Sequence, residues 1–216
     1  MCLNLFKVAE SIRRRPTPTL SFYFLPFNKP TCTPRLARRS VNTAKPYPAY
    51  SSTMPVELHG SCHCGAVKFS VESSTPVPYQ LCLCSICRKV GGAGGSINLG
   101  GISKSLKVEG KENISVYKAV LNRGTPQEKI ASSERNFCKK CSAMLWLYDK
   151  SWPELIHPFA SAIDSPELES PKKMVCIQLQ SKPAWVRLPE GEKDVYDVYG
   201  DLSLEEWHKK NKAFVA

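Results

Sequence analysis

The sequence predicts a mainly β fold: an antiparallel β-sheet with short helices, one of them near the C-terminus. Short apolar segments with strand-like alternation are separated by Gly, Pro and Ser, which is the pattern of an all-β domain. No ten-residue helical repeat lies between these segments, which argues against a parallel βαβ sheet. Seven of the ten cysteines fall in three tight clusters, a spacing that suits a tetrahedral metal better than long-range disulfides.

The first 53 residues differ in composition from the rest of the chain. They hold nine basic residues and one acidic residue and are rich in Arg, Ser, Thr and Pro. Such a leader fits a mitochondrial transit peptide better than a signal peptide. It also fits a disordered tail or a gene-model artefact upstream of a true start at Met54. On each interpretation residues 1–53 are a disordered or targeting leader, and the folded domain spans residues 54–216.

The charge and hydropathy of the domain exclude some classes of partner. Residues 54–216 hold 21 basic and 18 acidic residues, and this near balance argues against nucleic-acid binding by the folded domain. No stretch approaches 18 consecutive apolar residues, so no membrane-spanning helix is expected. Thiolate clusters imply a reducing compartment, and we expect a cytoplasmic protein, or a mitochondrial one if the leader is translated and acts as a transit peptide.

Six segments have the composition of strands. Ala66–Val71 alternates, with Val67, Phe69 and Val71 on one side. The other five segments are Tyr79–Leu83, Ser96–Leu99, Ile114–Val120, Met144–Tyr148 and Met174–Leu179. Cys176 lies alone in the last of them, where we expect a buried and inert thiol.

Two short helices are predicted. The first covers Ser85–Val90, within the middle cysteine cluster. The second lies near the C-terminus, where Ser203 and Glu206 have the spacing of a capping box. We expect this second helix to pack on the sheet through Trp207 and to leave a lysine-rich face in solvent.

The outer two cysteine clusters predict a closed metal site. Cys62 and Cys64 come just before the first predicted strand, and Cys138 and Cys141 just before another. Each pair places two thiolates at a turn. Two such turns on neighbouring strands supply four sulfurs for a tetrahedral Zn²⁺, the geometry of a structural zinc site.

The middle cluster has three thiols, Cys82, Cys84 and Cys87, and predicts an open site. Three protein ligands leave a fourth position on zinc for water or substrate, as in catalytic zinc sites. A fourth ligand from elsewhere, such as His59, His63, His157 or a lone cysteine, would instead close the site.

Two features follow the middle cluster directly. Arg88 and Lys89 are candidates for binding an anionic ligand near the zinc, or they end a solvated helix. The glycine-rich run 91–95 is a flexible loop, or it lets backbone N–H groups approach that ligand. No G-K-[ST] follows, so the run is not a P-loop.

The three clusters together resemble a known family. Gly60-Ser61-Cys62-His63-Cys64-Gly65-Ala66-Val67, the C-x-C-x-x-C-R of Cys82–Arg88, and Asn136-Phe137-Cys138-Lys139-Lys140-Cys141 are similar to the GFA/CENP-V domain, which includes the glutathione-dependent formaldehyde-activating enzymes. The resemblance covers about residues 55–165. The segment His157-Pro158-Phe159-Ala160 and the helix with Trp207-His208 are similar to fungal members.

The resemblance implies a zinc-stapled fold of the β-tent type, with two zinc ions per chain. It implies that the outer clusters are structural and that Cys82, Cys84 and Cys87 are catalytic. The expected activity is that of a carbon–sulfur lyase acting on adducts of glutathione with small aldehydes, with Arg88 and Lys89 holding glutathione carboxylates.

Two departures from the family pattern lie beside the expected active site. Many members have His between the first two cysteines of the triplet, where this chain has Leu83, and the small polar loop after the arginine is replaced by the glycine-rich run. Relatives of the CENP-V type also act in chromatin and cytoskeletal organisation, so a non-catalytic zinc-binding module for chromatin, cytoskeletal or protein partners is the alternative.

Overall fold

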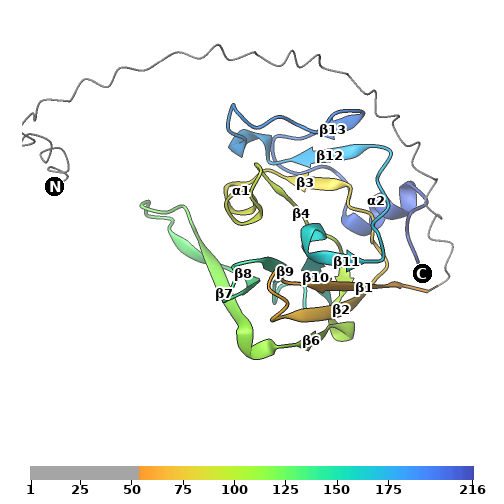
Figure 1. Ribbon diagram of the computed structural model, residues 1–216. Coiled ribbons are helices and arrows are strands. Elements are labelled where there is room, and N and C mark those ends of the chain that lie inside the picture. Colours follow the sequence, from red (N-terminus) through yellow and green to blue (C-terminus); the bar gives the residue numbers. More distant parts are fainter. Residues whose placement is uncertain (1–53) are drawn as a thin grey trace, which may run out of the picture. The chain divides into compact units, whose positions relative to one another are not determined.

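The computed structural model describes residues 54–216, which lie within one compact unit. The leader expected at 1–53 lies outside the described residues. The described part is mainly β, with thirteen strands in three sheets and two α-helices (Figure 1). The predicted fold class is therefore confirmed. Within residues 54–216, neither α-helix has the length and apolar content needed to span a membrane.

The first sheet is antiparallel and has the order β11-β1-β2-β6. Its strands are β1 (Val56–Ser61), β2 (Lys68–Ser73), β6 (Lys107–Glu109) and β11 (Ile163–Ser165). The second sheet is also antiparallel, with the order β5-β10-β9-β8-β7. Its strands are β5 (Gly101–Ile102), β7 (Ile114–Leu121), β8 (Lys129–Cys138), β9 (Met144–Tyr148) and β10 (Leu155–Pro158).

The third sheet is mixed and has the order β13-β12-β3-β4. Its strands are β3 (Gln80–Cys82), β4 (Ser96–Ile97), β12 (Met174–Ile177) and β13 (Lys193–Val195). Strand β12 is parallel to both β3 and β13. Parallel strands need a long connection between them. Between β3 and β12 this connection is the part of the chain that contains the second sheet, so no βαβ unit is formed.

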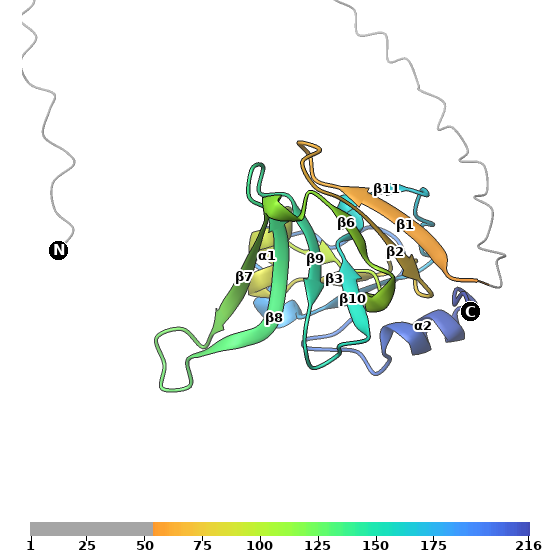
Figure 2. The ribbon, with the colours of Figure 1, turned by 90° about the horizontal axis from the view of Figure 1, so that it is seen from below.

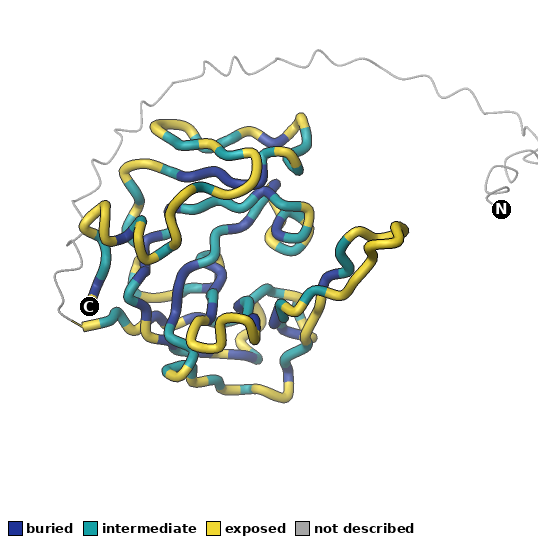
Figure 3. Tube along the Cα trace, turned by 180° about the vertical axis from the view of Figure 1, so that it is seen from behind, coloured by how far each residue is buried: buried dark blue, intermediate teal, exposed yellow. Residues whose placement is uncertain are grey.

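Two α-helices and four 3₁₀ turns complete the described chain. Helix α1 covers Ser85–Gly91 and α2 covers Leu204–Lys210, close to the two predicted helices. The 3₁₀ turns are η1 (Ser103–Ser105), η2 (Lys111–Asn113), η3 (Ala160–Ala162) and η4 (Leu179–Ser181). The β7–β8 hairpin projects from the rest of the unit (Figure 2), and its tip is exposed (Figure 3).

The main core lies between the first and second sheets. Apolar side chains such as Leu58 and Phe69 from the first sheet pack against Leu145 and Ile156 from the second. The ring of Phe69 meets Trp146 edge to face, with 5.2 Å between the ring centroids. Two smaller cores lie under the third sheet, and Cys176 is fully buried in one of them, beside Leu83 and Val186. The expected buried thiol at Cys176 is confirmed.

Helix α2 packs against the third sheet through Leu204 and Trp207. The capping box is present, because the Ser203 hydroxyl accepts from the Glu206 N–H and the Glu206 carboxylate accepts from the Ser203 N–H. The ring of Trp207 stacks on Tyr79 with 3.6 Å between centroids and 5° between planes. Lys209 and Lys210 are exposed. The predicted packing through Trp207 and the lysine-rich solvent face are therefore confirmed.

Candidate metal centres and active-site cavity

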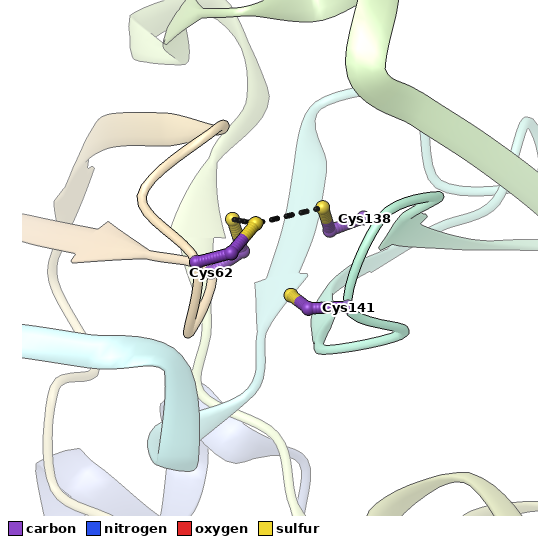
Figure 4. Close-up of side chains that lie close together, drawn as sticks. Cys62, Cys138 and Cys141 are labelled. Atoms are coloured by element: carbon purple, nitrogen blue, oxygen red, sulfur yellow. Dashed lines mark hydrogen bonds between the residues drawn. The ribbon is translucent and has the colours of Figure 1, made fainter.

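The outer two cysteine clusters meet where the first and second sheets join. Cys62 and Cys64 follow β1, and Cys138 and Cys141 lie at the end of β8 and in the turn after it. In Figure 4 the sulfur atoms of Cys62, Cys138 and Cys141 face a common centre, reached from two separate loops. Each loop is a tight turn: the Gly65 N–H donates to the Cys62 carbonyl, and the Ser142 N–H donates to the Cys138 carbonyl. Gly65 has a φ of +72°, which glycine adopts without strain.

The spacing of these four sulfurs fits a tetrahedral ion. All four lie within 4.8 Å of one another. The Cys62 and Cys64 sulfurs are 3.6 Å apart, and those of Cys64 and Cys138 are 3.8 Å apart. Four sulfurs at about 2.3 Å from a tetrahedral Zn²⁺ lie about 3.8 Å from each other. The donor set and its geometry therefore fit zinc.

The middle cluster is assembled where β3 of the third sheet ends and α1 begins. Cys82 ends β3, Cys84 is the N-cap of α1, and Cys87 lies in the first turn of that helix. The Cys84 sulfur accepts a hydrogen bond from the Cys87 N–H at 3.4 Å. The three sulfurs lie within 4.8 Å of one another, and within residues 54–216 no other His, Cys, Asp or Glu joins the group. The structure thus brings together the three predicted thiols and adds no fourth ligand from the described chain.

The histidines considered as a fourth ligand lie elsewhere. His63 is exposed on the loop after β1, and His59 is about half exposed beside Glu57. Only His157 lines the same cavity as the triplet, and its Nδ1 is engaged with the Leu99 carbonyl at 3.1 Å.

The three thiols of the triplet shift one another's pKa in opposite directions. Hydrogen bonds from Cys82 and Cys87 hold the pKa of Cys84 far below its ordinary value. The hydrogen bond to Cys84 in turn raises the pKa of Cys82. Three thiolates at this separation repel one another, so only a cation among them allows all three to ionise. This donor set also fits zinc.

A cavity of about 740 Å³ opens beside the triplet. That volume is within the range of about 300–1,000 Å³ usual for small-molecule sites. One wall is a single face of the second sheet, and the other comes from β3, the start of α1 and the segment 199–205. The cavity lining includes all three sulfur-bearing residues of the triplet, Cys82, Cys84 and Cys87.

The cavity also contains ionisable groups beyond the triplet, of which the sequence analysis named only His157, as a possible fourth zinc ligand. Burial lowers the pKa of His157, which keeps its ring neutral. Asp149 is buried, yet hydrogen bonds from the Ser151 N–H and the Ser132 hydroxyl keep its pKa below the ordinary value. Arg135 lies on the same wall. His157 and Arg135 are far from the triplet in sequence, and only an antiparallel pairing of their strands could have indicated that they share a face.

The predicted cationic pair does not line this cavity. Arg88 is half buried and Lys89 is exposed, both near the end of α1. Their assignment as carboxylate ligands stays a prediction.

The two departures from the family pattern are also outside the cavity lining. Leu83 is fully buried in the core with Cys176, on the side of the chain away from its neighbours Cys82 and Cys84. A Cβ at Gly94 would lie 2.6 Å from Val186, and one at Gly95 would lie 2.7 Å from the Cys82 carbonyl oxygen. Close packing therefore accounts for these glycines without a ligand.

Comparisons with known proteins show the family of this chain. The family model described as "Glutathione-dependent formaldehyde-activating enzyme" matches residues 57–178. A Halomonas elongata protein named "Putative glutathione-dependent formaldehyde-activating enzyme" is 47% identical over 155 residues, which is 71% of this chain and 95% of that protein. A crystal structure of a Rhodobacter sphaeroides protein matches with a TM-score of 0.40 and 25% identity, covering 50% of this chain and 90% of that one. On the family match and the Halomonas relative, this chain belongs to the glutathione-dependent formaldehyde-activating enzyme (GFA) family.

Proposed function

We propose that this protein is a zinc-dependent carbon–sulfur lyase that acts on adducts of glutathione with formaldehyde or similar small aldehydes, such as S-hydroxymethylglutathione. One observation carries the proposal: three thiols within 4.8 Å of one another line a cavity of about 740 Å³ and have no fourth ligand in the described chain. The family and the name of the Halomonas relative support glutathione and formaldehyde as the reacting pair.

Cys82, Cys84 and Cys87 would hold zinc at this site, and Cys62, Cys64, Cys138 and Cys141 a second, structural zinc. When bound to the triplet, zinc supplies a Lewis-acidic open position that lowers the pKa of a thiol, which makes it nucleophilic at neutral pH. The protein supplies the cavity, which holds thiol and aldehyde in contact and shields them from water.

The reaction itself needs no oxidant or reductant. In adduct formation the glutathione sulfur bonds to the carbonyl carbon, the π electron pair of the carbonyl moves to its oxygen, and the thiol proton ends on that oxygen. In the reverse direction the hydroxyl proton leaves, the carbon–oxygen double bond re-forms, and the carbon–sulfur bond breaks with its electron pair on sulfur. Each direction therefore requires one proton to move between sulfur and oxygen.

His157 is the candidate for this proton transfer. Its Nδ1 lies 3.1 Å from the Leu99 carbonyl, so Nδ1 carries the hydrogen and Nε2 is left as the acceptor. Burial lowers the pKa of His157 and keeps the imidazole in the neutral form that accepts a proton. A neutral histidine on the cavity wall is suited to carry the proton from sulfur to oxygen and back.

The proposal is tested by measuring how fast free glutathione and its formaldehyde adduct interconvert, with exchange NMR on the zinc-loaded protein. We expect catalysis by the wild type, a return to the spontaneous rate for Cys84→Ala, and a loss of about tenfold or more for His157→Gln. Cys176→Ala is the matched control, because it removes a buried thiol that belongs to neither cluster. A folded, zinc-loaded wild type that leaves the spontaneous rate unchanged would contradict the proposal and favour the non-catalytic zinc-binding module.

A further inference from the structure

Arg135 is a buried cation without an anionic partner. Its exposure is 6%, and no other lysine or arginine of residues 54–216 is buried. Its Nη1 donates to the Ser133 hydroxyl at 3.1 Å, while its Nε is buried with no hydrogen-bond partner. No ion pair joins it to a carboxylate of the described chain within 4.0 Å. A buried charge in this state is costly unless something else in the working protein pairs with it.

The strand register places Arg135 on the cavity wall. Arg135 on β8 lies opposite Leu147 on β9, and Leu147 lies opposite His157 on β10. Directly opposed residues of antiparallel strands point to the same face of the sheet. All three residues line the cavity, so the guanidinium of Arg135 and the imidazole of His157 lie on one wall. Their strands, β8 and β10, are separated by β9, which puts the two backbones about 10 Å apart.

The same guanidinium shares its cavity with the cysteine triplet. Arg135, Cys82, Cys84 and Cys87 all line this cavity of about 740 Å³. A ligand in the cavity with its sulfur at the triplet can therefore extend toward Arg135.

We propose that Arg135 binds a carboxylate of the thiol substrate and makes the cavity selective for anionic thiols. The inference rests on the proposed function in one respect: the sulfur of the ligand lies at the triplet. A guanidinium presents a planar fork of N–H donors that matches a carboxylate. Glutathione carries two carboxylates, and its adduct with formaldehyde retains both. Arg135, on the cavity wall, is better placed for this role than Arg88 and Lys89, which do not line it.

Two other charges bear on this assignment. Asp149 lies on the same wall, but its oxygens accept from the Ser132 hydroxyl and the Ser151 N–H, and no ion pair joins it to Arg135. The second charge is that of the triplet, because three thiolates around one Zn²⁺ carry a net negative charge. As its counter-ion, Arg135 would only balance the charge of the metal site. The two roles differ in what they predict, because a counter-ion acts on metal retention, whereas a carboxylate ligand acts on the choice of thiol.

The test compares reduced glutathione with its diethyl ester, which has the same thiol and no free carboxylate. Binding to the full-length, zinc-loaded protein is measured by calorimetry. We expect Arg135→Gln to weaken glutathione binding by about 10- to 100-fold, because a charge-assisted hydrogen bond to a carboxylate is lost. Binding of the ester should be unchanged. Arg135→Lys should recover part of the loss. Arg123→Gln, at an exposed arginine in the β7–β8 hairpin, is the matched control and should bind both thiols like the wild type.

Zinc content and thermal melts of each variant accompany the binding data. Unchanged glutathione binding by folded Arg135→Gln would overturn the inference. Equal weakening of the binding of glutathione and of its ester, together with loss of zinc, would also overturn it, because that result shows Arg135 to be a counter-ion of the triplet. If Arg135→Gln does not fold, the wild type decides: equal affinity for glutathione and its ester overturns the inference. A protein that binds glutathione through Arg135 but does not speed adduct exchange leaves this inference standing and refutes the lyase. If the wild type and Arg135→Gln both catalyse adduct exchange with the same KM for glutathione, the lyase proposal stands and this inference is refuted.

Discussion

At the scale of single residues, the surroundings decide what each polar side chain does. His208 is the clearest case outside the cavity. Its side chain is fully buried, its Nδ1 lies 2.7 Å from the Leu204 carbonyl, and its Nε2 accepts the Val77 N–H at 3.1 Å. Both ring nitrogens are therefore used by a neutral imidazole, and a proton on Nε2 would face the Val77 N–H, donor against donor.

We expect His208 to make stability depend on pH. Burial lowers its pKa in the folded protein, while the unfolded chain titrates at about 6.5. As the pH falls below about 6.5 the unfolded state takes up the proton first, so the free energy of unfolding decreases, by at most about 1.4 kcal/mol per pH unit, until the lower folded pKa is reached. Urea unfolding at pH 7, 6 and 5 should show a shallower decrease for His208→Gln than for the wild type. Parallel pH curves would show that His208 is not the titrating group.

At the scale of elements, strands and helices were not equally visible in the sequence. Strand β9 has the predicted bounds, because its five residues form one apolar run. The ten-residue strand β8 was not predicted, because Ser133, Glu134 and Arg135 interrupt any apolar alternation. Its side chains point into a polar cavity on one face, so burial there does not require apolar residues. Helix α2 was predicted from its cap, which depends only on residues three apart.

Helix α2 should contribute to stability mainly through Trp207. Truncation to alanine removes the stacked contact with Tyr79 and the other apolar contacts under the third sheet, so we expect Trp207→Ala to cost about 2–4 kcal/mol of unfolding free energy. Trp185 is 68% exposed and serves as the control. Trp185→Ala should change stability by less than about 0.5 kcal/mol. Denaturant unfolding monitored by circular dichroism checks both values, and equal losses would mean that α2 does not anchor through this ring.

At the scale of the whole described unit, the two cysteine clusters lie at different junctions. The four-cysteine cluster joins β1 of the first sheet to β8 of the second, and Cys62 and Cys138 are part of the main core. The triplet belongs to one local stretch, from the end of β3 to the first turn of α1. A metal ion in the four-cysteine cluster would link segments far apart in the sequence, since Cys64 and Cys138 are 74 residues apart. A metal ion in the triplet would link only residues within one short stretch of chain.

This difference predicts unequal effects of removing one ligand from each cluster. Cys138→Ala should lower the melting temperature by more than about 10 °C or abolish cooperative unfolding. The variant loses several kcal/mol of metal-linked folding free energy, and each kcal/mol lowers the melting temperature of a domain of this size by about 2–4 °C. Cys87→Ala should stay folded, melt within a few degrees of the wild type, and retain about one zinc ion of two. Metal analysis and thermal melts of both purified variants decide the question, and equal damage would refute the division into structural and open sites.

The sequence by itself determined the parts of this protein that depend on neighbouring residues. The seven clustered cysteines, the two turns that present four of them, the triplet at the start of α1 and the capping box of α2 are all contained within a few residues of chain. Their geometry follows from local backbone conformation, so the spacing of residue types is sufficient to predict them. The family resemblance rests on the same local motifs.

Only the tertiary structure decided what surrounds the triplet. Arg135 and His157 reach the cavity because β8, β9 and β10 pair in one register, and a shift of one residue would turn both to the opposite face. The sequence favoured Arg88 and Lys89 because they are adjacent to Cys87, but adjacency along α1 does not direct them to the cavity. The glycine-rich run could serve a ligand or close packing, and only the positions of Val186 and the Cys82 carbonyl favour packing. Contacts between distant segments depend on strand register and layer packing, which no short stretch of sequence encodes.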